Sequence, residues 1–598
     1  MNLPTRKNTQ LIDSVKKHDG FSLVEVLVAS ALMLVVFVGI AGAFQTIIEL
    51  ASYNKAKVSA LAVVSEKMEF IRNLSYDNIG TVSGIPSGTI PQTEIVSLNG
   101  IDYTRRVLVQ YVDAPEDGIA GADINGITTD YKRVKVEVSW AAKNATSTVF
   151  SVSNFVPKGI ETIAGGGTLI VNVLDAVGVP VASADVHIEN NILNPVVSVD
   201  TFTNISGQVL FPGSPAGSSY EVTVTKSGYS TAKTYASDIS NPNPSPGHMS
   251  VIEGQTNALT LQIDVFGSKT VKTYEQIKSV EWKDVFNDTS NISVLASTTI
   301  SGGDLILSGG AGNYESDGYI YSATTTPTYL ASWEEVSWID NNPPSTDIKY
   351  KIYDASGVSP VIISDGDMSG NSSGFTGSPI DISGLSISTY PSIQIAAFLN
   401  TADSNSTPSI LEWKIKYKEG PIPLPNLAFN MRGDKTIGTD GGGSPIYKYS
   451  KNLQTDGSGV LSITPLEWDS YTITIDNNTL GLDIGESCEP QSLSLLPGMS
   501  TTTSLYFVSQ TMNSLLVDVR NSSGNLLSSV SVRLYRSGVD ITKTSSLCGQ
   551  SFFSGVSSGT VSGGDAYTID LSLAGYTDTT VADVEVSGAS TVSVVIDD

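Results

Sequence analysis

One carboxylate in this sequence stands where a charge is costly. Glu25 directly precedes an apolar run over residues 26–44, in which Ser30 is the single polar side chain. As a helix, nineteen residues rise about 28 Å, which is close to the thickness of a membrane's hydrocarbon core. A carboxylate on the membrane side of such a segment costs roughly 2–3 kcal/mol and needs a partner. Ion pairing is therefore the chemistry that this residue can do.

The residues ahead of Glu25 carry a recognisable pattern. Lys16 and Lys17 precede Gly20 and Phe21, and basic residues on this side favour a cytoplasmic N-terminus. The stretch resembles the type IV prepilins and pseudopilins, whose short basic leader ends in Gly, followed by Phe, three residues, Glu and an apolar helix. The resemblance implies that a prepilin peptidase cuts between Gly20 and Phe21 and that the new amino group of Phe21 is methylated.

The same resemblance implies a partner for Glu25, namely the positively charged N-terminus of Phe21 in a neighbouring pilin or pseudopilin subunit. Such a pair would also set the register between subunits. The alternatives are an uncleaved signal anchor, or a secretory signal removed after the apolar run. Against removal, the helical pattern continues past Phe44 without a break or a small-residue cleavage site.

The pattern after Glu25 predicts the element that positions it. No proline interrupts residues 21–74, which predicts one long helix with residues 24–46 in the membrane. Residues 132–140 then alternate with valines on one face, which is typical of a strand. We expect a leader over residues 1–20 and a pilin-like module over residues 21–160, built from the long helix and a small antiparallel sheet.

Three later segments resemble one another. Each contains short alternating runs separated by glycine turns, as in Asp456-Gly457-Ser458-Gly459 before a strand-like run. They resemble the carboxypeptidase regulatory-like family of transthyretin-like sandwiches, which implies noncatalytic spacer, stalk or binding modules. We expect one seven-stranded antiparallel sandwich in each of the ranges 166–266, 424–508 and 512–598.

An insert over residues 278–419 differs from these repeats and looks like a jelly-roll or lectin-like β-sandwich. Its aromatic residues Trp333, Trp338, Tyr350 and Trp413 could stack on a sugar, although such side chains more often belong to the core. The whole chain is therefore predicted to be an α+β pilin module, with a long N-terminal helix and an antiparallel sheet, followed by several all-β sandwich domains.

Composition and spacing give little support to enzymatic chemistry. The formal charge of −26 disfavours nucleic acid as a partner. Three histidines are scattered without the spacing of a zinc site, and neither Glu334 with Glu335 nor Asp365 with Asp367 has a readable partner. We expect no catalytic residue, no cofactor and no metal, and therefore not an enzyme.

The two cysteines, Cys488 and Cys548, lie in the middle and last repeats. Disulfides persist outside the cytoplasm, so we expect these residues to pair and to join the two repeats. A loop of this length would contribute roughly 4 kcal/mol in the chain-entropy model. The alternative is a pair of free thiols.

Together these patterns predict a minor pilin or pseudopilin that docks in a type IV pilus or type II secretion-like filament. The chain would cross the inner (cytoplasmic) membrane once, with its C-terminal part outside the cytoplasm, and would reach the filament or cell surface. Its partners would be the prepilin peptidase, other subunits, the inner membrane, and a surface glycan or protein bound by the sandwiches. The competing hypothesis is a membrane-anchored surface stalk that never polymerises.

Overall fold

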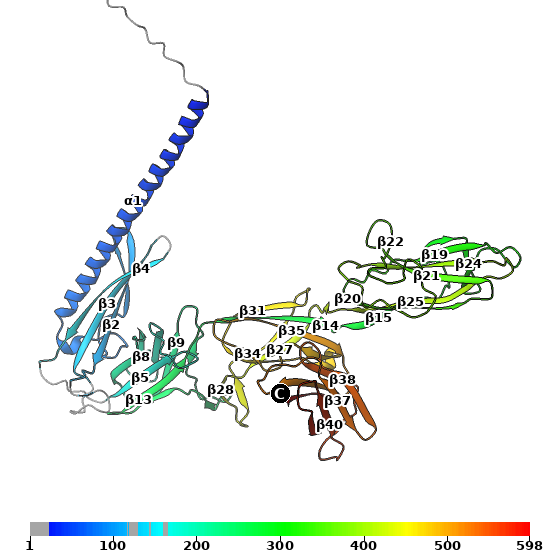
Figure 1. Ribbon diagram of the computed structural model, residues 1–598. Coiled ribbons are helices and arrows are strands. Elements are labelled where there is room, and N and C mark those ends of the chain that lie inside the picture. Colours follow the sequence, from blue (N-terminus) through cyan, green and yellow to red (C-terminus); the bar gives the residue numbers. More distant parts are fainter. Residues whose placement is uncertain (1–22, 117, 119–128, 143–144, 159–165, 598) are drawn as a thin grey trace, which may run out of the picture. The chain divides into compact units, whose positions relative to one another are not determined.

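The computed structural model describes residues 23–116, 118, 129–142, 145–158 and 166–597. They form one long helix, α1, followed by a series of β-sheets (Figure 1), which confirms the predicted fold class. The chain divides into two compact units. The first comprises Met1–Lys226, Thr231–Ser237 and Pro246–Ile263, and the second comprises Ser227–Ser230, Asp238–Ser245 and Asp264–Asp598. The predicted leader, with Gly20 and Phe21, lies outside the described residues.

Helix α1 spans Leu23–Arg72 and ends two residues before the end expected from the sequence. The run contains no proline, and its two glycines, Gly39 and Gly42, leave it unbroken. Beyond the apolar stretch, its buried residues recur three or four positions apart, which is the spacing of one helix face. They are Ala56, Ser59, Ala60, Val63, Val64, Lys67, Met68 and Ile71.

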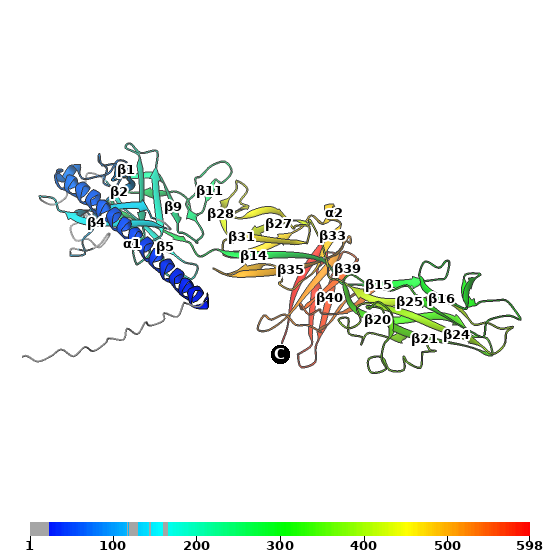
Figure 2. The same cartoon turned by 90° about the horizontal axis from the view of Figure 1, so that it is seen from above.

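The face of α1 that they form packs on a four-stranded antiparallel sheet in the order β1-β2-β3-β4 (Figure 2). The strands are β1 (Thr93–Leu98), β2 (Ile101–Val112), β3 (Tyr131–Ala141) and β4 (Thr146–Phe155). On β3, the alternating Val134, Val136 and Val138 are fully buried against the helix. The alternation read from the sequence therefore places a valine stripe in the core of this head.

The first sandwich pairs a three-stranded sheet, β13-β5-β8, with a sheet in the order β10-β9-β6-β7, in which β12 also pairs with β9. Its strands are β5 (Gly167–Leu174), β6 (Asp185–Asn190), β7 (Val197–Phe202), β8 (Gln208–Ser214), β9 (Gly217–Thr225), β10 (Ala232–Lys233), β12 (Met249–Val251) and β13 (Thr256–Gln262). Valines of β5 and β6, among them Val171 and Val186, are buried between the two layers.

The middle sandwich begins before the insert, outside the bounds expected from the sequence. Strand β14 (Gly267–Glu275) pairs with two strands of this sandwich that follow the insert, antiparallel with β31 and parallel with β35. The later elements are β26 (Ile422–Pro423), β27 (Ala428–Gly433), β30 (Ser450–Gln454), β31 (Val460–Leu466), β32 (Asp469–Thr474), α2 (Asn477–Leu480), β33 (Leu482–Ser487), β34 (Leu493–Leu495) and β35 (Ser500–Ser509). A small sheet, β11-β28-β29, adds β11 (Asn243–Pro244), β28 (Thr436–Thr439) and β29 (Pro445–Tyr447).

The insert is a sandwich of two antiparallel sheets around one large apolar core. One sheet contains β15 (Lys278–Asp284), β17 (Thr298–Ser301), β18 (Asp304–Leu307), β20 (Leu330–Asn341), β23 (Ile380–Asp381) and β25 (Ser409–Glu419). The other contains β16 (Ile292–Ala296), β19 (Asp317–Ser322), β21 (Thr346–Asp354), β22 (Val361–Ile362) and β24 (Ile393–Thr401).

The last sandwich combines the sheet β39-β36-β42 with the sheet β38-β37-β40-β41. Its strands are β36 (Ser514–Asn521), β37 (Ser531–Arg536), β38 (Val539–Thr544), β39 (Gln550–Ser554), β40 (Tyr567–Ser572), β41 (Thr579–Val584) and β42 (Ala589–Ile596).

The expectation of wholly antiparallel repeats is wrong. In each of the three smaller sandwiches the first strand pairs in parallel with the last, as β5 with β13, β14 with β35 and β36 with β42. The physical reason is that the last strand of each repeat covers an edge that the first strand would otherwise leave unpaired, and there it runs in the same direction.

Replacing Val271 of β14 by Ala tests whether β14, which precedes the insert, belongs to the middle sandwich that follows it. Val271 is fully buried in the core of the middle sandwich, so the substitution should lower the free energy of unfolding of this sandwich by roughly 2 kcal/mol. Hydrogen exchange should accelerate in β27 and stay unchanged in β24 of the insert. The matched control is Val358→Ala, at a fully exposed position, which should change neither. Faster exchange confined to the insert would contradict this assignment of β14.

Candidate functional site

The first half of α1 presents an uncovered apolar surface. Among the described residues, α1 is the one helix long and apolar enough to cross a membrane, with a mean hydropathy of 2.6 in its most apolar window and none of that window buried. Large apolar side chains such as Leu34, Phe37 and Val38 are each more than 60% exposed. An apolar surface of this extent has to be covered by lipid or by other protein chains.

The polar groups of this stretch are few. Ser30 donates from Oγ to the carbonyl of Leu27 at 2.9 Å, so its hydroxyl is satisfied within the helix. Glu25 is the third residue of α1, but its side chain lies outside the described part of the structure. The pairing expected for Glu25, and the processing expected at Gly20 and Phe21, therefore stay predictions.

The second half of α1 is fixed to the head by specific polar contacts as well as by apolar packing. The hydroxyl of Tyr103 on β2 donates to the carbonyl of Ala56 at 3.0 Å, and Asn99 donates from Nδ2 to Oγ of Ser59 at 3.0 Å. The ring of Trp140 on β3 lies 6.1 Å from that of Tyr103. These contacts set both the position and the rotation of the helix on the sheet.

A cluster of ion pairs, which we call the helix lock, reinforces this attachment. Lys67 of α1, whose side chain is only 9% exposed, contacts Glu94 of β1 at 2.6 Å. Arg105 of β2 also contacts Glu94, at 3.0 Å, and lies 3.7 Å from Glu66 of α1. One carboxylate on the sheet thus serves a buried cation of the helix and a buried cation of the neighbouring strand. Periodicity in the sequence does not predict this cluster. The adjacent Arg105 and Arg106 in β2 are the sequence signal that could have pointed to it.

The helix lock shifts the ionisation of its central carboxyl. Burial of Glu94 by itself raises its pKa, but the hydrogen bond from Lys67 and the charge of Arg105 outweigh burial and hold the pKa below its ordinary value. A carboxyl whose pKa is lower in the folded state stabilises the fold above its unfolded pKa. That contribution is lost as the pH falls through the folded value.

A groove lies where α1 leaves the head. It has a volume of about 580 Å³ and is bounded by one face of the helix and by the end of β3 at Trp140. The residues that line it are Thr46, Glu49, Leu50, Ser52, Tyr53, Ala56, Ile101, Trp140, Ala141, Ala142 and Ala145. The groove therefore offers an apolar floor at the boundary between the uncovered and the packed halves of α1.

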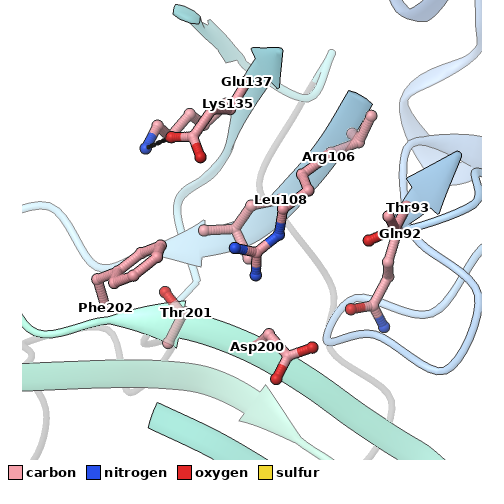
Figure 3. Close-up of a pocket in the computed structure, with 10 residues that line it drawn as sticks. Gln92, Thr93, Arg106, Leu108, Lys135, Glu137, Asp200, Thr201 and Phe202 are labelled. Atoms are coloured by element: carbon pink, nitrogen blue, oxygen red, sulfur yellow. Dashed lines mark hydrogen bonds and ion pairs between the residues drawn. The ribbon is translucent and has the colours of Figure 1, made fainter. Parts of the chain in front are cut away.

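The junction between the head and the first sandwich, within the first compact unit, leaves only a small pocket. Figure 3 shows Arg106 extending from β2 toward β7, with Lys135 and Glu137 paired nearby at 2.6 Å. The guanidinium of Arg106 lies 5.6 Å from the ring centre of Phe202, and the amide of Ser198 donates to the carbonyl of Ser83 at 2.7 Å. The space left between these side chains is about 30 Å³, which has room for very few water molecules.

The aromatic residues considered as sugar platforms in the insert are core residues. Trp333, Tyr350 and Trp413 are fully buried and Trp338 is 6% exposed, all within one apolar cluster. The alternative in which they stack on a sugar is therefore wrong. Their side chains point between the two sheets because each belongs to the inward-facing set of its strand.

The paired carboxylates of the insert have structural partners. Glu335 contacts Lys416 at 2.6 Å, and Glu334 contacts Lys418 at 3.5 Å. Asp365 accepts the backbone amide of Ser372, and Asp367 accepts the hydroxyl of Tyr390 at 2.8 Å. Within the described residues, no group of three or more His, Cys, Asp or Glu is placed to hold a metal ion.

The structure joins Cys488, just after β33, to Cys548, just before β39, with their Cα atoms 4.4 Å apart. Beside them, the amide of Ser487 donates to Oε1 of Gln550, and Nε2 of Gln550 donates to the buried Asp518. Burial raises the pKa of Asp518 above its ordinary value. The middle and last sandwiches thus meet at a polar contact next to the sulfur atoms.

Comparison with known protein families identifies a sequence motif at the N-terminus. Residues 15–41 match the model described as the prokaryotic N-terminal methylation motif. No curated protein matches the chain. The motif covers the three positions singled out from the sequence, Gly20, Phe21 and Glu25. The chain therefore carries the N-methylation motif of a prepilin-type N-terminus, and this motif extends into the first half of α1, whose apolar surface is uncovered.

Several solved structures show distant likeness. The Bacillus anthracis TIE protein is 12% identical, with 85% of this chain and 73% of that chain covered and a TM-score of 0.15. BcpA, the major pilin subunit of Bacillus cereus, is 10% identical over 72% and 99%, with a TM-score of 0.13. The major pilin SpaD from Corynebacterium diphtheriae is 9% identical over 73% and 99%, also at 0.13. TM-scores this low carry no inference about function.

The helix lock predicts a pH-dependent contribution to stability. Glu94→Gln removes the negative charge that contacts both Lys67 and Arg105. The free energy of unfolding of the head should therefore fall by about 1–2 kcal/mol at neutral pH. The difference between wild type and variant should shrink as the pH falls through the lowered pKa of the folded Glu94 carboxyl, because the wild-type side chain then protonates. Thermal unfolding at a series of pH values measures it. The control is Glu69→Gln, an exposed carboxylate of α1 that pairs with Arg72 outside the helix lock. A difference independent of pH would refute the mechanism.

The two cysteines give a covalent test. We expect mass spectrometry of the non-reduced protein to show one peptide pair linked through Cys488 and Cys548, and no alkylation of either thiol before reduction. Replacing both residues by serine should weaken the last two sandwiches toward heat and leave the head unaffected. Alkylation of both thiols in the native protein would show that the bond does not form.

Proposed function

We propose that this chain is a minor pilin or pseudopilin, which docks in a filament through α1 and displays its β-sandwiches outside the cytoplasm. The observation that carries the proposal is the methylation motif at residues 15–41, placed on a helix with an uncovered apolar surface. A prepilin peptidase would release Phe21 as the new N-terminus. Other pilin-like subunits and the inner membrane would then cover the apolar part of α1.

The charge on Glu25 has a defined role in this proposal. Within a bundle of apolar helices, an unpaired carboxylate is costly, whereas pairing with the N-terminal amine of a neighbouring subunit removes that cost. The pair forms only when two helices are in register, so it selects one arrangement of subunits. A helix that stays alone in the membrane has no such partner to gain.

The size of the chain favours a low-copy position. The described residues from 166 onward belong to sandwich domains, which together are much larger than the head. A shaft of closely packed subunits leaves little room for such a mass on every copy, whereas a filament tip or an initiating complex needs only a few copies. We therefore propose display for adhesion or spacing, in either a type IV pilus or a type II secretion-like filament, with no catalytic role.

A second function remains a distinct hypothesis. The chain could anchor a surface stalk that never polymerises, since an uncovered apolar helix also fits a simple membrane anchor. The two hypotheses differ in what Glu25 does, because a lone anchor gains nothing from a carboxylate at this position.

Glu25→Gln separates the two hypotheses. The substitution keeps the size of the side chain and removes its charge, so the chain should still be processed and inserted but should enter filaments about tenfold less. Immunoblots of sheared filaments and of membranes, from cells with an active filament system, measure the two pools. The matched control is Glu69→Gln, which changes an exposed side chain on the second half of α1 and should incorporate normally. Absence of even the wild-type chain from filaments would favour the stalk.

A further inference from the structure

Strands β19, β24 and β21 lie next to one another in one sheet of the insert (Figure 1). The outer face of this sheet carries a second set of aromatic residues. Ile320, Ile352 and Ile395 of these strands are fully buried in the core, so the residues that alternate with them face outward. Four of the outward residues are aromatic, and we call them the aromatic face: Tyr319, Tyr321, Tyr353 and Phe398.

Strand register places these rings side by side. Tyr319 pairs across the sheet with Phe398, and Tyr321 pairs with Ala396. The ring centres of Tyr321 and Tyr353 are 5.0 Å apart, and Tyr319 lies 6.0 Å from both Tyr321 and Phe398. Because Ala396 is small and fully buried on this face, the larger rings close over it. Tyr319 and Phe398 are tilted by 34° to each other, and Tyr321 stands edge-on between its neighbours, so the rings form one aromatic cluster.

Polar groups border the aromatic face. Asp317, Asn400 and Asp347 are paired in one row across the three strands, next to the row that holds Tyr319. Lys349 and Lys351 continue along β21, and Nζ of Lys351 lies 5.4 Å from the ring centre of Phe398. An aromatic cluster bordered by both hydrogen-bond donors and acceptors suits a ligand with apolar faces and a polar rim.

The floor of the face holds an unused acceptor. Gln394, which pairs with Tyr353, is 3% exposed and donates from Nε2 to the carbonyl of Ser322 at 2.9 Å. Its Oε1 is buried and, in the part of the chain that the structure describes, accepts no hydrogen bond. A buried acceptor without a donor costs free energy, which a bridging water would recover.

Charge narrows the choice of occupant. Residues 278–419 contain seven lysines and no arginine against seventeen acidic residues, which gives a formal charge of −10. Five of these lysines lie on the opposite sheet. Lys278 is paired with Glu275 of β14. The other four are paired with glutamates of the same sheet: Lys283, Lys414, Lys416 and Lys418. A second copy of this domain or an anionic polymer would meet like charge, whereas a neutral ligand would not.

We propose that the aromatic face binds a neutral polysaccharide whose sugar rings carry mainly equatorial substituents. Such a ring presents axial C–H groups on its faces, which pack on aromatic rings, and hydroxyl groups at its edge, which hydrogen-bond to bordering polar groups. The run from Tyr319 to Tyr353 offers room for more than one sugar unit, so a chain fits better than a monosaccharide. The inference rests on the proposed display function and gives it a ligand class.

The test is the retention of the purified full chain, in detergent, on insoluble cellulose and on chitin, with a neutral glycan array in parallel. We expect retention on at least one of these neutral glycans. Tyr319→Ala should weaken it roughly five- to tenfold, because one stacking ring is lost. Tyr319→Phe keeps the ring and should retain most of the binding, which separates stacking from a general loss of folding.

Tyr329→Ala is the matched control, since this tyrosine of the same domain is 41% exposed against 40% for Tyr319 but lies off the aromatic face. It should bind as wild type does. Retention on none of the neutral glycans, retention on heparin–agarose instead, or equal binding by Tyr319→Ala would overturn the proposal. A dimer in sedimentation velocity that Tyr319→Ala abolishes would assign the face to a second copy. None of these outcomes bears on filament docking, which the Glu25 variant tests separately.

Discussion

The apolar surface on the first half of α1 is the constraint on which the rest of the molecule depends. Water cannot cover it at acceptable cost, because roughly 25 cal/mol is lost for each Å² left exposed and many large side chains are involved. Lipid covers such a surface before assembly, and other apolar helices can cover it afterwards. The second half of the same helix carries the head, so whatever covers the first half also determines where the folded domains are held.

The first half of α1 can determine where the head lies only if the helix is rigidly attached to the head. The buried valine stripe of β3 supplies the bulk of the packing energy, while Lys67, Glu94 and Arg105 fix the rotation of the helix on the sheet. Packing alone would tolerate small rotations, since apolar contacts are not directional. The ion pairs are directional and lie between buried or half-buried groups, where charge is weakly screened. The head and the helix can thus act as one body.

Local periodicity was enough to predict α1 and strand β3 of the head, because the 3.6-residue and two-residue repeats can be read directly from the sequence. Nesting of the insert was not predictable in this way. Strand β14 pairs with β31 and β35 across more than 180 residues, and nothing in residues 267–275 indicates which distant strands complete their sheet. The parallel closing pairs were missed for the same reason.

The aromatic residues show the same limit. Trp333 and Trp413 are large and attracted attention, yet alternation alone does not say which set of side chains faces inward. The signal that could have found the aromatic face is the run Asp317-Gly318-Tyr319-Ile320-Tyr321, where tyrosines alternate with small or aliphatic residues. This alternation predicts a strand with tyrosines on one face and small or aliphatic residues on the other. It indicates an aromatic cluster only when the neighbouring strands of the sheet are known.

The central claim is that α1 begins as a processed, pilin-type N-terminus, and the most direct measurement is mass spectrometry of the N-terminal peptide of the chain isolated from its native membrane. The account predicts a peptide that starts at Phe21, with one methyl group on its α-amine and a free carboxyl on Glu25. A peptide that still contains Gly20 and the residues before it, from cells whose prepilin peptidase is active, would contradict the account.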